Sequence, residues 1–347
     1  MSEPDFSTLL DELDVRDMAG FTRKFVSDIS ASLDAKIDLE EDSDWSGVIC
    51  LGMGGSGAGG LFLQALSDNS GGLPFVVWRD YGIPSWWGPD WLVMATSYSG
   101  NTEETLDGVR EAIANGGTVV GICSGGKLEE VIEGSDGSVC LKVPSGQMPR
   151  SAFGHIFGMQ LAACWALGLL PEPSRKSLSE MLQRLSQASS DADLENDAGM
   201  TATLARSLVG KKIGIVTPPS LAPAAYRFAC QLNENSAKFA RFAEIPEMNH
   251  NEIVAWTSDS QENNALLMLS YEGAHQRTKT RIDWVLDEVL ASPSWKIDCE
   301  GETLLESLLY AAHVSDWISI GLAVLTGEDP SDMPAIDSLK SHLASIQ

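Results

Sequence analysis

Two short segments rich in glycine and hydroxyl side chains have the composition of an oxyanion site. Gly52-Met53-Gly54-Gly55-Ser56-Gly57 follows one apolar run, and Ser97-Tyr98-Ser99-Gly100-Asn101-Thr102 follows another. Each places hydroxyls and backbone N–H groups at the end of a predicted strand, where a helix is predicted to begin, and such helix N-termini attract anions. The pattern predicts a phosphate site without a metal ion. A polar stretch around Glu234 and His250 further indicates an enzyme that acts on a phosphorylated small molecule.

A dinucleotide is an alternative ligand for the first segment. The segment satisfies G-x-G-x-x-G, and the predicted strand Pro74–Trp78 ends near Asp80, about where a dinucleotide-binding fold places its ribose-binding acid. The second segment favours a phosphate monoester, because Ser97, Ser99 and Thr102 can coordinate a phosphate dianion together with a helix N-terminus. A dinucleotide fold does not need these hydroxyls. Turns with a purely structural role are the third interpretation.

The composition limits the classes of partner. Acidic residues outnumber basic ones by 49 to 23, and the formal net charge is −26. So many carboxylates must lie at the surface, which argues against nucleic acids and anionic membranes as partners. An anionic substrate must therefore be attracted by local donors.

Cysteine usage and the apolar segments indicate a cytoplasmic protein. The six cysteines form no C-x-x-C pair and no zinc-finger spacing, so reduced thiols are expected. Met1–Asp5 has no basic residue and no apolar stretch follows it, so no signal peptide is expected. The apolar stretches Phe157–Leu170 and Trp317–Leu325 are shorter than the roughly 20 residues of a membrane span and are predicted to be core helices.

Strand-like and helix-like segments alternate along the 347 residues, which predicts an α/β protein with doubly wound, mostly parallel sheets flanked by helices. The expected organisation is a helical N-terminal segment (1–45), a first domain (46–170), a linker with a helix (171–198) and a second domain with C-terminal helices (199–347). Strands are expected at Val48–Leu51, Pro74–Trp78, Trp91–Thr96, Thr118–Cys123, Val139–Val143, Lys212–Thr217, Phe239–Ala243, Ala265–Ser270 and Trp295–Ile297. Helices are expected at Ser56–Leu66, Thr102–Asn115, Ser151–Leu169, Ser177–Leu185, Ala222–Glu234, Arg277–Leu290, Glu302–Leu325 and Ala335–Ile346.

Further motifs make the pattern specific when they are taken with the two hydroxyl-rich segments. In chain order these motifs are Gln147–Gly154, Asn233–Lys238, Pro246–Asn251, Asp329–Ser331 and Ile336–Lys340. Over roughly residues 45–345 the chain resembles the sugar isomerase (SIS) domain proteins. Among these it is similar to the bifunctional phosphoglucose/phosphomannose isomerases.

The resemblance implies two SIS-type domains and an aldose–ketose isomerase. Such an enzyme interconverts glucose 6-phosphate, and with it mannose 6-phosphate, with fructose 6-phosphate through a cis-enediol(ate). Glu234 takes the role of the proton shuttle, because a carboxylate can remove a proton from C2 and return it to C1. His250 and Lys340 open the sugar ring, and Arg150 stabilises the enediolate. The resemblance also implies a homodimer in which His250 comes from the neighbouring subunit, and neither a cofactor nor a metal ion is expected.

The remaining site residues follow from the same resemblance. Ser331 stands where many relatives have a threonine that helps to accommodate the C2 epimer, and serine keeps the hydroxyl but lacks the methyl group. The substrate phosphate is assigned to Gly55, Ser56, Ser97, Ser99 and Thr102.

Two other functions stay open. One is a non-catalytic regulator that binds sugar phosphates, and the other is an isomerase of another sugar or amino sugar phosphate.

Overall fold

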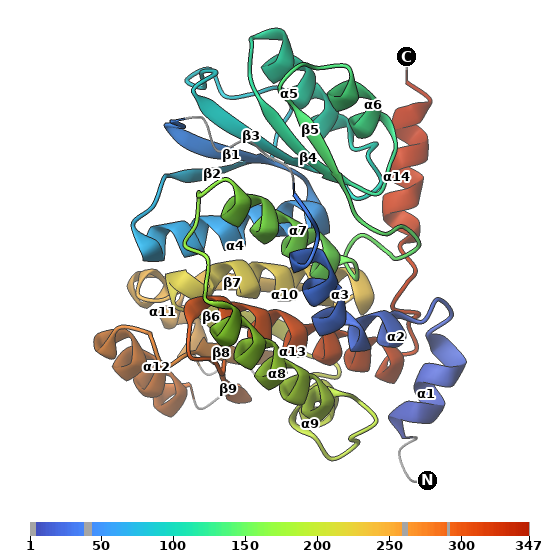
Figure 1. Ribbon diagram of the computed structural model, residues 1–347. Coiled ribbons are helices and arrows are strands. Elements are labelled where there is room, and N and C mark those ends of the chain that lie inside the picture. The colour runs from blue at the N-terminus through green and yellow to red at the C-terminus, as the bar shows by residue number, and fades with distance from the viewer. Residues whose placement is uncertain (1–4, 38–43, 259–262, 290–291, 347) are drawn as a thin grey trace.

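The chain forms two parallel sheets with helices between and around them (Figure 1). The computed structural model describes residues 5–37, 44–258, 263–289 and 292–346, so the first four residues and the expected helix end at Leu290 lie outside the described residues. The strand order is β2-β1-β3-β4-β5 in the first sheet and β7-β6-β8-β9 in the second, and every pair of neighbours is parallel. The predicted fold class, α/β with two doubly wound sheets flanked by helices, is confirmed.

Short apolar runs form the strands, because strands covered by helices on both faces are buried on both faces. β1 and β4 are buried along their whole length. The first sheet consists of β1 (Gly47–Leu51), β2 (Phe75–Trp78), β3 (Trp91–Thr96), β4 (Val119–Cys123) and β5 (Val139–Lys142). The second consists of β6 (Lys212–Thr217), β7 (Ala240–Glu244), β8 (Asn264–Ser270) and β9 (Ser294–Asp298).

Helices connect the strands and also precede and follow them. The helices of the first half are α1 (Phe6–Leu13), α2 (Met18–Arg23), α3 (Phe25–Leu33), α4 (Gly54–Ser70), α5 (Glu103–Ala114), α6 (Lys127–Glu133) and α7 (Phe153–Ala166). Those of the second half are α8 (Arg175–Ala192), α9 (Met200–Ser207), α10 (Ala222–Asn235), α11 (Ile253–Trp256), α12 (Gln276–Glu288), α13 (Leu304–Leu325) and α14 (Pro334–Ala344). Two 3₁₀ turns are η1 (Pro219–Leu221) and η2 (Glu247–His250).

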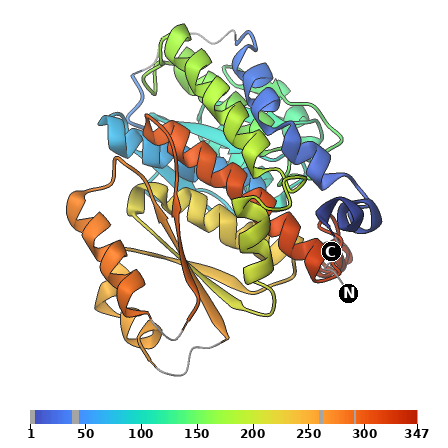
Figure 2. The ribbon, with the colours of Figure 1, turned by 90° about the horizontal axis from the view of Figure 1, so that it is seen from below.

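The largest hydrophobic core lies between the two sheets. Alternate residues of β1, such as Val48 and Cys50, point into it, and so do Ile213 and Ile215 of β6. The helices α4, α7, α10 and α13 fill the space between the sheets, and Figure 2 shows α12 on the outer side of the second sheet. The opposite faces form smaller cores, with α5 and α6 on the first sheet and α12 on the second.

The helix α13 is long and apolar enough to cross a membrane, but 89% of its apolar window is buried inside the protein. It contacts α1, α2, α8, α9 and α10, and is therefore a core helix of the fold. By contrast, α14 has no buried side chain. It runs beside the first half of the molecule, although it follows α13 in the chain (Figure 1, red).

The elements differ from expectation mainly at helices. The helices α6 and α9 were not expected, and the helix expected at Ser177–Leu185 runs from Arg175 to Ala192. The helix expected at Ser56–Leu66 begins at Gly54 and continues to Ser70. It ends where Gly71 adopts a left-handed conformation with φ of 73°, which costs glycine little.

Candidate active site

The two hydroxyl-rich segments meet at the carboxyl ends of β1 and β3. These strands are neighbours, and the chain leaves them toward opposite sides of the sheet. Open α/β sheets bind their ligands at such a switch point. The backbone N–H of Tyr98 donates to Oγ of Ser56 at 3.1 Å, so the two segments are in direct contact.

The hydroxyls of the second segment have different environments. Ser97 is fully buried, and its Oγ lies 2.9 Å from Oγ1 of Thr102, the residue that precedes α5. Oγ of Ser99 accepts a hydrogen bond from the N–H of Asn101 at 3.3 Å. Because the first N–H groups of α4 and α5 have no acceptor within their own helices, both helix ends can add donors for a phosphate.

A cavity of about 510 Å³ opens beside these segments. This is the size of a small-molecule site. Three other parts of the chain complete its wall, namely the segment before α7, the end of α10 and one face of α14. It is lined by Met53, Gly54, Gly55, Ser56, Tyr98, Ser99, Asn101, Thr102, Glu103, Glu104, Pro149, Arg150, Glu234, Met333, Ile336, Leu339, Lys340 and Leu343.

Gly55 brings the first segment close to Arg150. A Cβ atom at position 55 would lie 3.0 Å from Cα of Arg150 and 3.3 Å from the carbonyl oxygen of Pro149. Any side chain would therefore separate the two backbones. The glycine allows the backbone of Arg150 to lie against the first hydroxyl-rich segment.

Glu234 and Arg150 lie beside each other in the wall of this cavity. Nε of Arg150 lies 3.9 Å from Oε2 of Glu234, and the arginine side chain is 2% exposed and the glutamate 23%. Burial raises the pKa of Glu234, while the charges of Arg150, Arg227 and Lys340 act in the opposite direction. A carboxylate with a raised pKa, partly open to a cavity and next to a fixed cation, has the properties of a general base.

The structure brings most of the predicted site residues together. Gly55, Ser56, Ser99, Thr102, Arg150, Glu234 and Lys340 all line the cavity. Ser97 lies behind it and contacts Thr102. Lys340 is exposed on α14 and is close enough to lower the pKa of Glu234.

Besides Ser97, two predicted residues lie outside this cavity in the single chain. His250 is exposed at the end of η2, beyond β7, and does not line the cavity. Ser331 is buried, and its Oγ donates to Oδ1 of Asp329 at 2.7 Å. The residues described here contain no cluster of three or more histidine, cysteine, aspartate or glutamate side chains arranged to hold a metal ion.

Sequence reasoning missed the apolar part of the wall. Ile336, Leu339 and Leu343 lie three or four residues apart, so they share one face of α14, and Met333 precedes the helix on the same side of the cavity. That spacing was visible in the sequence. The sequence did not indicate that this face covers a cavity of the first half, far away in the chain.

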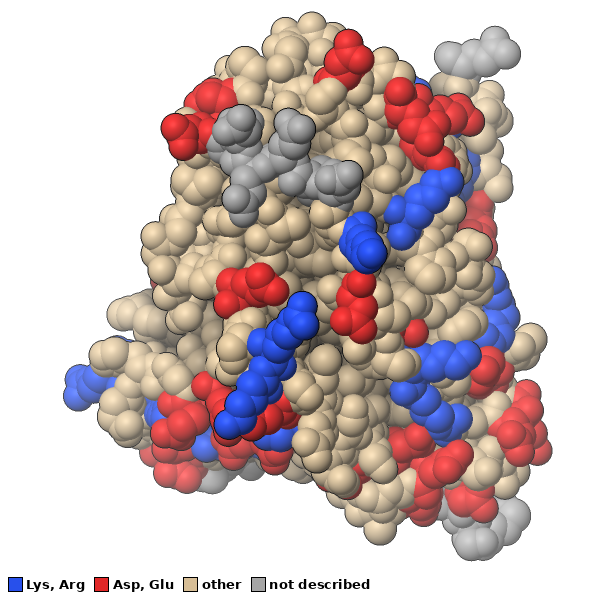
Figure 3. All heavy atoms as spheres, in the orientation of Figure 1, with Lys and Arg blue, Asp and Glu red and all other residues tan. Residues whose placement is uncertain are grey.

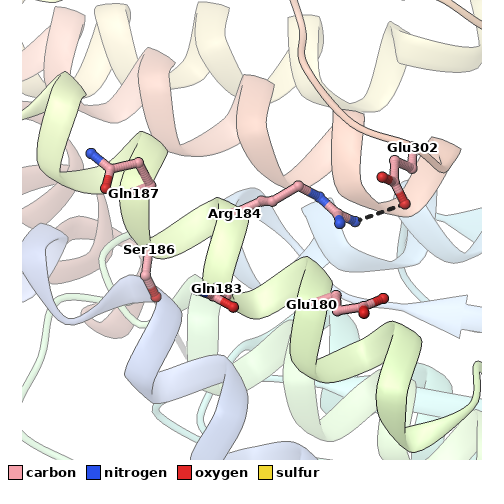
Figure 4. Close-up of a pocket in the computed structure, with 6 residues that line it drawn as sticks. All are labelled: Glu180, Gln183, Arg184, Ser186, Gln187 and Glu302. Atoms are coloured by element: carbon pink, nitrogen blue, oxygen red, sulfur yellow. Dashed lines mark ion pairs between the residues drawn. The ribbon is translucent and has the colours of Figure 1, made fainter.

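Other hollows lie among the described residues, including one of about 600 Å³ lined by Arg79, Tyr226 and Glu244, but neither hydroxyl-rich segment lines it. Acidic and basic side chains are interspersed on the face seen in Figure 3, without a continuous basic surface. A hollow on α8 is lined by Glu180, Gln183, Arg184, Ser186, Gln187 and Glu302 (Figure 4). There Arg184 pairs with Glu302 at 3.2 Å and also with Glu306, so its charge is already neutralised.

Comparisons with known proteins identify relatives that match most of this chain. The family model of the bacterial phospho-glucose isomerase C-terminal SIS domain matches residues 197–343. A bifunctional phosphoglucose/phosphomannose isomerase of Aquifex aeolicus is 33% identical, over 88% of this chain and 93% of the relative. The enzyme of the same name from Caldicellulosiruptor bescii is 33% identical, over 86% of this chain and 90% of the relative.

A solved structure shares the fold over nearly the whole chain. The crystal structure of a hypothetical protein from Thermus thermophilus matches with a TM-score of 0.73 and 15% identity, over 97% of this chain and 92% of that one. The sequence relatives are similar enough, and over enough of their length, to show the family. The chain belongs to the bifunctional phosphoglucose/phosphomannose isomerases.

Proposed function

We propose that this protein interconverts glucose 6-phosphate and mannose 6-phosphate with fructose 6-phosphate through a cis-enediol(ate). One observation carries the proposal: a single cavity has hydroxyls and helix N-termini on one wall, and the carboxylate of Glu234 with Arg150 on another. The first wall suits the phosphate. The second suits proton transfer between adjacent carbons.

The reaction needs only groups that this chain supplies. The phosphate binds at Ser56, Ser99 and Thr102, which fixes the position of C1 and C2. Glu234 removes the proton from C2 of the open-chain aldose and returns it to C1, so the carboxylate is regenerated at the end of each turnover. The guanidinium of Arg150 stabilises the negative charge that develops on the enediolate oxygens.

Ring opening is proposed to use His250 and Lys340. A neutral imidazole can move a proton between the ring oxygen and O1 near neutral pH. His250 is exposed in its own chain and lies outside the cavity, which is consistent with a homodimer in which it reaches the neighbouring subunit's site. The proposed reaction requires neither a metal ion nor a redox cofactor, and we propose that it takes place in the cytoplasm.

A coupled assay with purified protein tests this function. Glu234→Gln is expected to lower the rate on glucose 6-phosphate and on mannose 6-phosphate by at least about 100-fold, because the amide cannot accept the proton. Glu244→Gln is the matched control, since burial also raises the pKa of Glu244 but this residue does not line the cavity. Binding of fructose 6-phosphate without turnover by the wild-type protein would instead identify a regulator.

A further inference from the structure

Asn235 is a buried amide next to Glu234 at the end of α10. Its side chain is almost fully enclosed, with 1% exposure. Oδ1 accepts a hydrogen bond from Nε of Arg150 at 2.6 Å, and Nδ2 donates to Oγ of Ser319 at 2.9 Å. The amide therefore connects the arginine of the site to the core helix α13.

Hydrogen-bond directions fix the orientation of this amide. The hydroxyl of Ser319 donates its one proton to the carbonyl oxygen of Asp316 at 2.8 Å. Oγ of Ser319 can then only accept from Asn235, which requires the amide nitrogen on that side. The amide oxygen must consequently face Arg150, whose Nε–H is always a donor.

Other contacts hold the rest of Arg150 from different sides. Nη1 contacts Sδ of Met333 at 3.1 Å, and Nη2 donates to the carbonyl oxygen of Pro330. The carbonyl oxygen of Arg150 accepts from Nη2 of Arg227 at 3.0 Å, and Arg227 is itself paired with the buried Asp316. Asn235 is distinct among these partners because it engages Nε, the atom that lies 3.9 Å from Glu234.

The distance of 3.9 Å matters for a general base. A carboxylate in direct, charge-assisted contact with arginine is about 2.7–2.9 Å from the nitrogen and is a much weaker base. If Nε had no other acceptor, the nearby Glu234 could take that place. An acceptor that occupies Nε prevents this while it leaves the positive charge beside the reacting atoms.

We propose that Asn235 is a positioning residue that holds Arg150 beside Glu234 without a direct bond, so that the carboxylate remains free to accept the substrate's proton. This inference rests on the function proposed above. It gives the amide a role that acts through Arg150 and requires no contact with the substrate.

Several charged or titratable groups surround Glu234. Arg227 belongs to the same helix, Lys340 reaches it from α14, and Arg150 from the segment before α7. Glu103 and Glu104 of α5 line the same cavity, and Cys230 lies one turn earlier on α10. A substitution at position 235 leaves all of these residues in the chain, so a changed pH profile would report the new position of Arg150.

The experiment compares the pH dependence of kcat/KM for wild type and Asn235→Leu on fructose 6-phosphate. Leucine has a similar size but no acceptor, so Arg150 is expected to close on Glu234. The acid limb should move to lower pH by about one unit, and the plateau of kcat should fall roughly tenfold or more, because a less basic carboxylate removes the proton more slowly. A purely structural role would lower the plateau without moving the limb.

Asn235→Asp is the second variant and remains informative if the leucine variant does not fold. It keeps the acceptor for Arg150, so the plateau should stay within about threefold of wild type. Its added negative charge should move the acid limb to higher pH, opposite to the leucine variant. The proposal would be overturned if the acid limb of Asn235→Asp moved to lower pH, or if its plateau of kcat fell as far as that of Asn235→Leu.

Asn233→Leu is the matched control. Asn233 is on the same helix, but its amide bonds to the backbone of Ala240 at 2.9 and 3.2 Å, away from Arg150. Its pH profile should match the wild type. The positioning role is wrong if Asn235→Leu and Asn233→Leu give the same unshifted pH profile. The isomerase function still stands in that case, provided that the wild type is active and Glu234→Gln is not. If the wild type itself has no isomerase activity, the function is wrong.

Discussion

The hydroxyl oxygens of Ser97 and Thr102 lie 2.9 Å apart, with Ser97 fully buried and Thr102 on the cavity wall. The buried serine thus holds the threonine hydroxyl in place. This arrangement separates a residue on the cavity wall from the buried residue that supports it.

Thr102→Val should weaken phosphate binding. The substitution keeps the shape and removes one donor to a dianion, so KM for fructose 6-phosphate should rise about tenfold or more with a smaller effect on kcat. The measurement is steady-state kinetics with the coupled assay. Thr105→Val is the control, because the Thr105 hydroxyl is buried without a hydrogen-bond partner in the described part of the chain. An equal rise in KM for both variants would contradict the assignment.

The activity should be lost in acid at a higher pH than an ordinary glutamate would give. Burial raises the pKa of Glu234 above its usual 4.5. The residue must be deprotonated to accept a proton, so activity is full above the raised pKa and falls as the pH decreases through it. The profile of kcat/KM between about pH 4 and 9 measures this limb. A limb at or below pH 4.5 would show that the charges of Arg150, Arg227 and Lys340 outweigh burial.

His250 should complement Glu234 between subunits. Mixing and refolding equal amounts of the two inactive variants, Glu234→Gln and His250→Ala, should restore about one quarter of the wild-type sites, because half of the dimers are mixed and each carries one intact site. The coupled assay measures the recovered rate. No recovery, with mixed dimers demonstrated by a mass tag, would mean that His250 does not complete the neighbouring subunit's site.

Ending the chain after Met333 should abolish activity and preserve the fold. The helix α14 buries no side chain, so the midpoint of thermal unfolding should change by less than about 2 °C. The cavity loses Lys340 and its apolar wall, and kcat/KM should fall by roughly 100-fold or more. The variant Lys340→Met removes the charge and keeps the apolar wall, so it separates the contribution of the lysine to activity from that of the wall. A large loss of stability would mean that α14 supports the core.

The sequence predicted those elements whose conformation depends on neighbouring residues in the chain. The bounds of β3 and β6 were predicted correctly because each has an apolar centre, and because polar and glycine residues follow β3 while Pro218 and Pro219 follow β6. The helix α6 was missed because it has only seven residues and two buried side chains, Leu128 and Ile132, so its packing on β4 and β5 decides its conformation.

The site divides in the same way. The two hydroxyl-rich segments were recognisable in the sequence because the residues of each are contiguous, and their role as phosphate ligands stays a prediction. The contact between Arg150 and Asn235 joins residues 85 positions apart. The cavity likewise brings residues 53–104 together with residues 333–343, which are far away in the chain. The spacing of residues in the sequence does not indicate such long-range contacts, because they depend on how the two halves of the chain pack together.

The shared layer of helices between the sheets has a consequence for unfolding. Residues of both halves belong to one hydrophobic cluster. If one sheet unfolded, the inner face of the other would be exposed to water. Heat should therefore disrupt both together in a single cooperative transition. A destabilising substitution in either half then lowers the melting temperature of the whole molecule.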